Sequence, residues 1–361
     1  NLIHIISNYI ELNNNVKVAI VGGYVRDLLI SKIHKKKFFE PLDIDIVTEG
    51  SSIELAKFIK RNISNVEICL IKEFEIYNTV ELNINNLKID IASARTENYE
   101  APGVNPIVKK TNIKDDLKRR DFSVNAIAFE FSKREIYDFF DGIKHIKSKE
   151  LHLLHKNSIQ DDPSRLIRCA RYASRLGFKI SNKSLQQSQR LVAIWPWICI
   201  KDENKFRFPP GISIRIRMEL SEIYKYDNLA NILSLLSEWK VMPILNKNIN
   251  VNNRFLRGLK WNKKLKGNHI LYLLKNSENL DLTCQRFFIN SKERKILKDY
   301  LIITNQLENE KEKFIYFTPS NWTEFIETKN LDEETVKLLI CDGSFFWKPF
   351  FKWLFIYKFI K

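Results

Sequence analysis

Two aspartates at alternate positions of one apolar segment are suited to hold a divalent cation. Asp43 and Asp45 lie in residues 42–47, and because side chains alternate along a strand, both carboxylates face the same side. Such oxygen ligands suit Mg²⁺, which also coordinates substrate phosphates. Asp90, in the comparable segment 87–92, is a weaker candidate for a third catalytic carboxylate. The pattern predicts a phosphoryl-transfer site; aspartates on a solvated strand face are the structural alternative.

A pair of glycines separates an apolar strand from a helical segment. Gly22 and Gly23 follow residues 18–21 and precede Arg26. Such a turn presents backbone N–H groups and a helix N-terminus, so the pattern predicts a phosphate-binding turn. No third glycine and no Lys-Ser or Lys-Thr pair follows, so neither a dinucleotide-binding fingerprint nor a Walker A loop is supported. An ordinary turn between strand and helix is the alternative.

A third set of polar residues begins a helical segment at Pro163. Arg165, Arg168 and Arg171 recur at three-residue spacing and form a basic stripe on one side of that helix. Asp162 and Arg165 together offer an acceptor and donors for the Watson–Crick edge of a nucleobase. In the alternative interpretation, Asp162 only caps the helix and the arginines are solvated or pair with acids elsewhere.

Hydrophobic periodicity divides the chain into two kinds of structure. The first 140 residues read as α/β, and the chain from about residue 163 reads as all-helical. The expected strands are residues 16–21, 42–47, 66–71, 79–82, 87–92 and 127–131. The expected helices include residues 24–31, 53–61, 164–176, 229–239 and 292–307, with breaks near residues 208–211 and 246–253.

The net charge of +16 is concentrated in the second part of the chain. Residues 1–145 hold 21 basic and 21 acidic side chains, whereas residues 146–361 hold 38 basic and 22 acidic ones. This partition indicates that chemistry and polyanion binding lie in different domains, with a Lys-rich soluble surface as the alternative. The densest basic segment contains the candidate RNA-binding residues Arg254, Arg257, Lys260, Lys263 and Lys264.

Cysteine usage and hydropathy bound the cellular setting. The five cysteines are odd in number and form no CxxC pair, which argues against a disulfide framework and a zinc knuckle. No uncharged stretch of 18 residues occurs, so the sequence predicts no membrane span. A reducing cytoplasm is the expected location.

Four motifs in a fixed order resemble those of class II tRNA nucleotidyltransferases, the family of CCA-adding and A-adding enzymes and related bacterial poly(A) polymerases. The family pattern GGxVRD corresponds to residues 22–27, and DxD to residues 43–45. The ribose-selecting pattern RRDFTxNA corresponds to residues 119–126, and the base-reading pattern EDxxR to residues 161–165.

The resemblance implies an α/β, polymerase-β-like nucleotidyltransferase head at 1–145. A helical neck at 146–208 and a helical body and tail at 209–361 would follow and hold RNA. The implied reaction is attack of a tRNA 3′-hydroxyl on the α-phosphate of CTP or ATP, with release of pyrophosphate. Mg²⁺ would be held by Asp43 and Asp45.

The resemblance also implies a nucleotide-binding role for each motif. Gly22, Gly23 and Arg26 would lie at the triphosphate. Asp162 and Arg165 would read the base, and Arg168 and Arg171 would assist at the phosphates. The sugar and its surroundings are assigned to Arg119 or Arg120 with Asp121 and Asn125.

The chain departs from the family pattern at a few positions. Asp161 and Ser123 replace Glu and Thr, which are mild changes. His145 and His152 stand where the pattern has Asp and Arg, in a region that resembles a hinge between head and neck. These two changes put interdomain motion in question more than the chemical step.

Three alternatives to full CCA synthesis remain open at this stage. An enzyme that adds only A is one, and residues 94–106 resemble that branch. A poly(A) polymerase shares every head motif. A non-catalytic RNA-binding protein with an inactive head is the third, against which Asp43, Asp45 and Arg165 argue. The oligomeric state is not encoded in any of these patterns.

Overall fold

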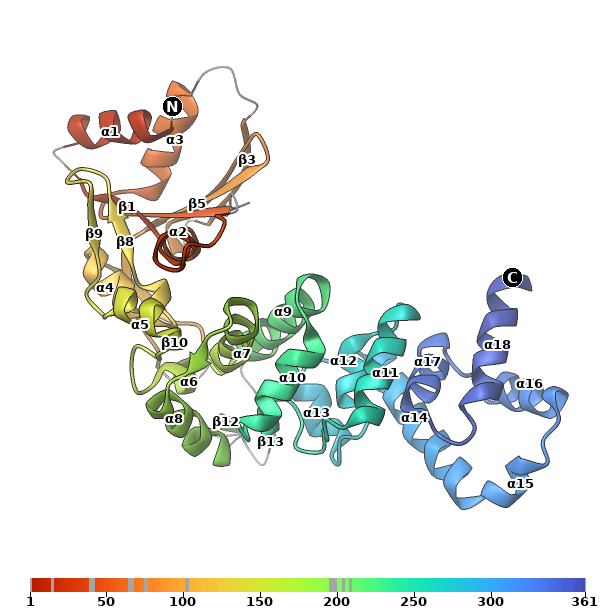
Figure 1. The fold of residues 1–361 in the computed structure, drawn as a ribbon. Coiled ribbons are helices and arrows are strands. Elements are labelled where there is room, and N and C mark those ends of the chain that lie inside the picture. Colours follow the sequence, from red (N-terminus) through yellow and green to blue (C-terminus); the bar gives the residue numbers. More distant parts are fainter. Residues whose placement is uncertain are drawn as a thin grey trace. The chain divides into compact units, whose positions relative to one another are not determined.

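The computed structural model describes residues 2–13, 16–38, 43–63, 68–74, 77–100, 104–194, 200–202, 205–207 and 210–360 (Figure 1). The chain forms two compact units. The first comprises Asn1–Arg165 and Leu176–Gln187, and the second comprises Leu166–Arg175 and Ser188–Lys361.

A seven-stranded mixed sheet forms the framework of the first unit. Its order is β3-β4-β5-β2-β1-β8-β9; β2 and β5 pair in parallel, and the other neighbours pair antiparallel. The strands are β1 (Val18–Val21), β2 (Asp43–Thr48), β3 (Ile68–Phe74), β4 (Thr79–Ile84), β5 (Leu87–Ser93), β8 (Ala128–Glu130) and β9 (Glu135–Tyr137). The expected strands are confirmed, except that residues 42 and 66–67 lie outside the described part.

The two faces of the sheet differ in what they carry. Helices α1 (Leu2–Leu12) and α3 (Ser52–Asn62) pack on one face, and Ile44 and Ile46 point into that core. The opposite face carries Ala19, Val21 and Val47, which pack near α4 (Ile113–Lys118). Since side chains alternate along β2, its two aspartates lie on this second face with Val47, as predicted.

Short elements complete the first unit around the second face of the sheet. The turn after β1 leads into α2 (Gly23–His34), and β6 (Arg95–Asn98) pairs with β7 (Ile107–Lys110). The remaining elements are η2 (Ser123–Asn125), α5 (Gly142–Ser148), β10 (Glu150–Leu151), α6 (Ser158–Asp161) and β11 (Lys179–Ile180). Two helices, α7 (Ser164–Leu176) and α8 (Asn182–Ala193), have residues in both units.

The second unit is almost entirely helical, as expected. Its helices are α9 (Pro210–Tyr226), α10 (Leu229–Glu238), η3 (Met242–Ile244), α11 (Asn253–Lys264), α12 (His269–Leu274), α13 (Leu280–Arg286), α14 (Ser291–Asn309), α15 (Lys311–Ile315), α16 (Pro319–Thr328), α17 (Glu333–Asp342) and α18 (Trp347–Ile360). The predicted break at 246–253 separates η3 from α11, whereas residues 208–209 of the other break lie outside the described part.

Small strands are the one departure from an all-helical second part. β12 (Ile200–Asp202) pairs with β13 (Lys205–Arg207), and β11 pairs in parallel with β10. Strands of two or three residues are too short to produce a readable alternation in the sequence. Across the residues that the structure describes, no helix combines the length and apolar character needed to cross a membrane.

Candidate active site

The turn after β1 lies directly against one of the predicted catalytic aspartates. Val21, the last residue of β1, is paired with Asp45 of β2, and Gly22 follows with a φ of 72°. A Cβ atom at Gly22 would lie 2.8 Å from Asp45 Oδ2. Only glycine allows both this left-handed backbone and this close approach. The turn and the carboxylate therefore form one site.

The aspartates of β2 and β5 lie in an electrostatically unfavourable cluster. Asp45 is in register with Asp90 on the parallel strand β5. Burial raises the pKa of Asp45, nearby Asp90 and Asp43 raise it further, and Arg120 and Lys88 oppose this change. Burial also raises the pKa of Asp90, although Lys88 donates a hydrogen bond to its Oδ2 atom at 3.0 Å. A bound cation would relieve this repulsion.

The donor set at this cluster is open rather than cage-like. Among the described residues, no group of three or more His, Cys, Asp or Glu side chains is placed to hold a metal ion. Asp43 is exposed at the start of β2, and Asp90 Oδ1 is a buried acceptor without a partner in the described part of the chain. Mg²⁺ is commonly held by one or two carboxylates plus water and substrate phosphates. The residues present fit that mode of binding.

Arg26 connects the glycine turn to the segment that contains Asn125. Its side chain is only 3% exposed, and it makes a bidentate pair with Asp27, with Nε–Oδ1 and Nη2–Oδ2 distances of 2.7 and 2.9 Å. Arg26 Nη1 also donates to Asn125 Oδ1 at 2.7 Å, and Asn125 Nδ2 donates to Asp121 Oδ1 at 2.9 Å. This buried chain fixes the two motifs relative to each other, while a contact of Arg26 with a triphosphate stays a prediction.

A buried carboxylate that the sequence analysis missed organises the next pair of arginines. Asp116 is fully buried; its Oδ1 accepts from Arg119 Nη2 at 2.6 Å and its Oδ2 from Arg120 Nη2 at 3.3 Å. Burial opposes ionisation, but Arg120 and Arg119 outweigh it and hold the pKa of Asp116 below its usual value. Arg119 Nη1 also donates to Glu97 Oε1 at 2.7 Å. The spacing of three and four residues from Asp116 was the available signal.

The predicted base-reading residues lie next to this arginine pair. Asp162 Oδ1 accepts hydrogen bonds from the backbone and hydroxyl of Ser164, so the capping interaction given as the alternative is present. Arg165, 8% exposed, donates from Nη2 to the carbonyl of Arg119 at 2.9 Å. Its Nη1 lies 3.2 Å from His155 Nε2. Base reading stays a prediction, but the structure joins the segments expected at the base and at the sugar.

The other two arginines of α7 belong to the second unit and share one acid there. Arg168 Nη1 lies 2.9 Å from Glu219 Oε1, and Arg171 Nη1 lies 3.2 Å from Glu219 Oε2. Glu219, on α9, was not singled out from the sequence because it is about fifty residues away along the chain. A single carboxylate therefore holds these two like charges close together.

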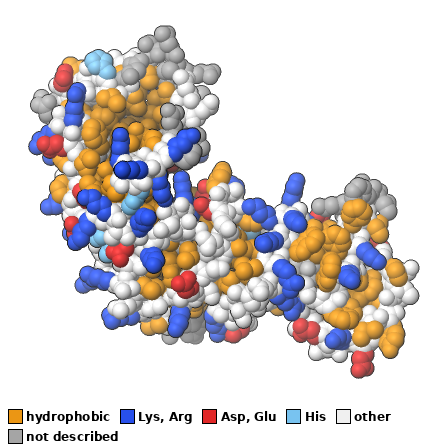
Figure 2. Space-filling view, in the orientation of Figure 1, with side chains coloured by type: hydrophobic (Ala, Val, Ile, Leu, Met, Phe, Trp, Pro, Cys, Tyr) orange, Lys and Arg blue, Asp and Glu red, His pale blue; other side chains and the backbone are white. Residues whose placement is uncertain are grey.

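The candidate RNA-binding residues on α11 have a different character. All five are exposed; Arg254 pairs with Asp342, and the Lys263 and Lys264 ammonium groups lie over the rings of Tyr224 and Trp261. Figure 2 shows Lys and Arg side chains spread over the helical part of the molecule. Their accessibility suits contact with a polyanion, and the contact itself is untested.

The two histidines that depart from the family pattern meet in the first unit. The rings of His145 and His152 stack with centroids 3.6 Å apart. His145 Nδ1 lies 2.8 Å from Ser123 Oγ, and His152 Nε2 lies 2.9 Å from Glu150 Oε2. Burial lowers the pKa of His145, and His152 lowers it further. A stacked imidazole pair thus stands where the pattern has an acid and a base.

Comparison with known proteins agrees with these motifs. An A-adding tRNA nucleotidyltransferase from Aquifex aeolicus is 32% identical over 253 residues, which are 69% of this chain and 27% of that protein. A CC-adding tRNA nucleotidyltransferase from Deinococcus radiodurans is 33% identical over 183 residues, or 50% of this chain and 46% of that protein. The chain thus spans less than half the length of these two curated relatives.

A solved structure supports the fold over nearly the whole chain. The Thermotoga maritima CCA-adding enzyme complexed with tRNA aligns with a TM-score of 0.66 over 99% of this chain and 81% of that one, at 22% identity. Residues 18–152 match the Poly A polymerase head domain family. Residues 18–152 therefore belong to the Poly A polymerase head domain family, within a chain whose relatives include A-adding and CC-adding tRNA nucleotidyltransferases.

Proposed function

We propose that this chain is an enzyme that adds C and/or A nucleotides to the 3′ end of tRNA without a template. CTP and ATP would be the substrates, and pyrophosphate would leave. The approach of Asp45 to the Gly22 turn, beside Arg120, is the observation that carries the proposal. It places acidic oxygen ligands, a phosphate-binding turn and a cation within one site.

Mg²⁺ is the proposed cofactor, because nucleotidyltransferases generally use divalent metal ions. Asp43 and Asp45 would hold it, with Asp90 on the adjacent strand. When bound, Mg²⁺ would neutralise triphosphate charge and make the attacking hydroxyl more acidic. The unpartnered Asp90 Oδ1 and the raised pKa of Asp45 support a cation at this position.

The remaining residues of the first unit would bind and orient the nucleotide. Backbone N–H groups after Gly22 and Gly23 would meet the triphosphate, with Arg26 as a positioning residue through Asn125. Asp121 and Asn125, with Arg119 or Arg120, would lie at the sugar. Asp162 and Arg165 would read the base, and in the second unit Arg168 and Arg171 would assist at the phosphates.

The division into head, neck, body and tail at 1–145, 146–208 and 209–361 is part of the same proposal. The exposed cations of α11 would attract the RNA in the body. A tRNA partner agrees with the tRNA complex of the Thermotoga maritima enzyme. A cytoplasmic location is proposed with this function.

Addition of A alone is the second candidate, because the Aquifex aeolicus relative carries that name. The Deinococcus radiodurans relative is named for CC addition, so likeness to relatives does not choose between them. The structure describes most of residues 94–106, which resemble the A-adding branch, as part of the β6–β7 hairpin; residues 101–103 lie outside it.

The deciding experiment supplies one labelled nucleotide at a time to tRNAs that lack A, CA or CCA. Incorporation of CMP on the shortest acceptor, followed by AMP, would establish CCA synthesis. AMP incorporation only on the acceptor ending in CC would establish A addition. Extension of unstructured RNA with ATP would instead indicate a poly(A) polymerase. RNA binding without incorporation on any acceptor would favour the inactive-head alternative.

A further inference from the structure

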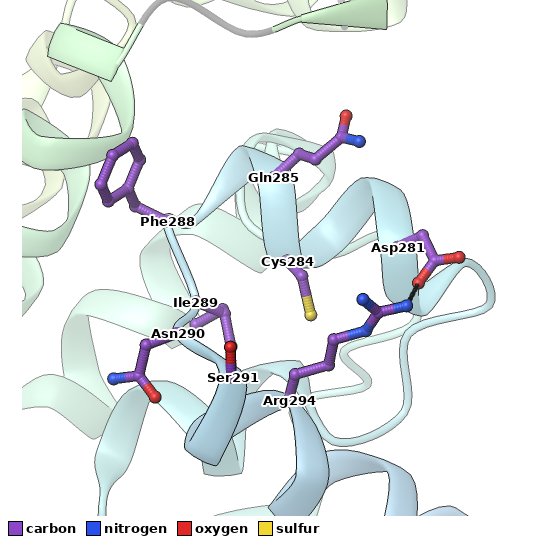
Figure 3. A pocket seen from close by; sticks show the side chains of 8 residues that line it. All are labelled: Asp281, Cys284, Gln285, Phe288, Ile289, Asn290, Ser291 and Arg294. Atoms are coloured by element: carbon purple, nitrogen blue, oxygen red, sulfur yellow. Dashed lines mark hydrogen bonds and ion pairs between the residues drawn. The ribbon is translucent and has the colours of Figure 1, made fainter. Parts of the chain in front are cut away.

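A pocket in the second unit lies between the end of α13 and the start of α14 (Figure 3). Its volume is about 680 Å³, within the usual range for sites that bind nucleotide-sized molecules. Phe288 and the Arg294–Asp281 ion pair border it on different sides, and Cys284 Sγ lies between them (Figure 3). None of these residues belongs to the active site described above.

Phe288 occupies a backbone position that normally requires glycine. Its φ is 52°, and it follows the end of α13 in a Schellman motif, in which Ile289 N donates to Cys284 O at 2.9 Å and Phe288 N to Gln285 O at 3.3 Å. A bulky residue in this left-handed region is unusual and strained. Its side chain is 58% exposed, so packing into the core does not account for the choice.

The backbone that carries the ring is held rigidly from α9. Arg217 Nη1 donates to the carbonyls of both Phe287 and Phe288 at 3.1 Å. Arg217 also pairs with Glu293 of α14 at 3.1 Å. The ring therefore stands at the pocket rim as a fixed aromatic surface rather than on a freely moving loop, which reduces the entropy lost when a ligand stacks on it.

The other walls offer polar groups and a cation. Arg294 is 55% exposed and pairs with Asp281, while Gln285, Asn290 and Ser291 line the remaining rim. Burial raises the pKa of Cys284, so its thiol presents a neutral, polarisable surface. A planar aromatic group with hydrogen-bonding edges and an adjoining phosphate matches this set of walls.

We propose that this pocket binds an unpaired nucleobase of an RNA strand, stacked on Phe288, with Arg294 facing the adjoining phosphate. Aromatic rings accept any base by stacking, and arginine supplies the charge for the backbone. Residues 251–300 hold 12 basic and 4 acidic side chains, which complements a polyanion better than an acidic or neutral protein partner. The inference rests on the proposed RNA-binding function but not on its chemistry.

The test measures binding of a single-stranded hexaribonucleotide with a central 2-aminopurine to the full chain, without nucleoside triphosphates. Stacking should quench the fluorescence of the base analogue. Phe288→Gly should weaken binding roughly tenfold, as expected for the loss of one base–aromatic stack, and abolish the quenching. The same variant should raise Tm, because glycine relieves the left-handed backbone.

Two further variants separate stacking from backbone strain. Phe288→Leu keeps the strained backbone and an apolar side chain, so it should lose quenching without the gain in Tm. Asn330→Gly is the matched control, because Asn330 has a φ of 47° in the same kind of helix end in the second unit. It should leave quenching and RNA affinity unchanged.

Unchanged quenching and affinity in both Phe288 variants would overturn the proposal. A lower Tm for Phe288→Gly, with RNA binding retained, would show that the ring is a packing element or a contact for another protein. Because no nucleotide is incorporated in this assay, its result is independent of the acceptor experiment. A chain that binds RNA through Phe288 but incorporates nothing would keep this inference and reject the proposed chemistry.

Discussion

The arginines of the first unit and the cations of α11 show two different uses of positive charge. Arg119 is 21% exposed at its side chain and is anchored by the buried acids Asp116 and Glu97. On α11, Arg254 is 57% exposed and its neighbours project into solvent. Fixed cations can distinguish ligands by geometry, whereas exposed ones attract a polyanion at longer range and add nearly independently. Substitutions in the two regions should therefore fail in different ways.

The largest effect is expected at the carboxylates of β2. Asp43→Asn or Asp45→Asn should lower nucleotide incorporation by at least roughly 1,000-fold, because the cation ligands are lost. The dissociation constant for tRNA, measured by filter binding, should remain nearly unchanged because the proposed RNA-binding cations lie elsewhere. Robust incorporation by both variants in Mg²⁺ would rule out the metal assignment.

Removing the acid that anchors two arginines should cost stability as well as activity. Asp116→Asn leaves Arg119 and Arg120 without their shared buried partner, so the free energy of unfolding should fall by about 3 kcal/mol in urea titrations. The matched control is Glu278→Gln, which breaks the exposed pair with Lys247 and should cost less than about 1 kcal/mol. Equal losses in the two variants would remove the distinction between anchored and exposed charge.

Base discrimination should depend on Asp162 and Arg165. Either alanine variant should reduce the preference for CTP and ATP over UTP and GTP by about 10- to 100-fold in kcat/KM, because base-edge hydrogen bonds are lost. Ser164→Ala is the control, since it disturbs the helix cap and keeps the Asp162 carboxylate. If Ser164→Ala relaxes specificity as much, Asp162 acts through capping alone.

Neutralising α11 should act on binding in a graded way. Replacing Arg254, Arg257, Lys260, Lys263 and Lys264 by Gln should raise the KM for tRNA. The slope of log affinity against log salt should fall by roughly 0.7–0.9 for each phosphate that the protein no longer neutralises. Nucleotide KM should stay constant. Lys57→Gln with Lys60→Gln on α3 serves as the control, and an equal effect there would show that only overall charge matters.

The smallest effect concerns pH. Burial, with Arg165 and Lys118 nearby, lowers the pKa of His155 to about 4, below the value near 6.5 of an unfolded chain. The unfolded state thus binds more protons between these values, so stability is lost as pH falls from about 6.5 toward 4. The loss, followed by urea unfolding at several pH values, should be smaller in His155→Gln. Parallel curves for the two proteins would contradict the burial of a neutral imidazole.

The sequence was informative where local pattern and local structure coincide. Helix α7 matches the predicted residues 164–176, and the alternation of β2 places Asp43 and Asp45 on the face opposite Ile44. The pairing of Asp45 with Asp90 could be anticipated only as a shared context, because register in a parallel sheet depends on residues distant in the chain.

Partnerships between distant residues were beyond the sequence analysis. Nothing local indicates that Arg26 bonds to Asn125, or that Arg168 and Arg171 share Glu219. Motif knowledge assigned these arginines to the nucleotide, whereas the structure gives each a protein acid or amide. Such pairs arise when the tertiary fold closes, and periodicity contains no record of that step.

The position of β1 in the sheet sets an order of events during synthesis. One neighbour of this strand, β2, follows within about thirty residues, but the other, β8, begins only at Ala128. A nascent chain that has released the glycine turn and both β2 aspartates still exposes one hydrogen-bonding edge of β1, open to pairing with other chains. The ribosome must deliver more than eighty further residues before this edge is covered, so slow translation of that stretch prolongs the interval in which the newborn head is prone to aggregate.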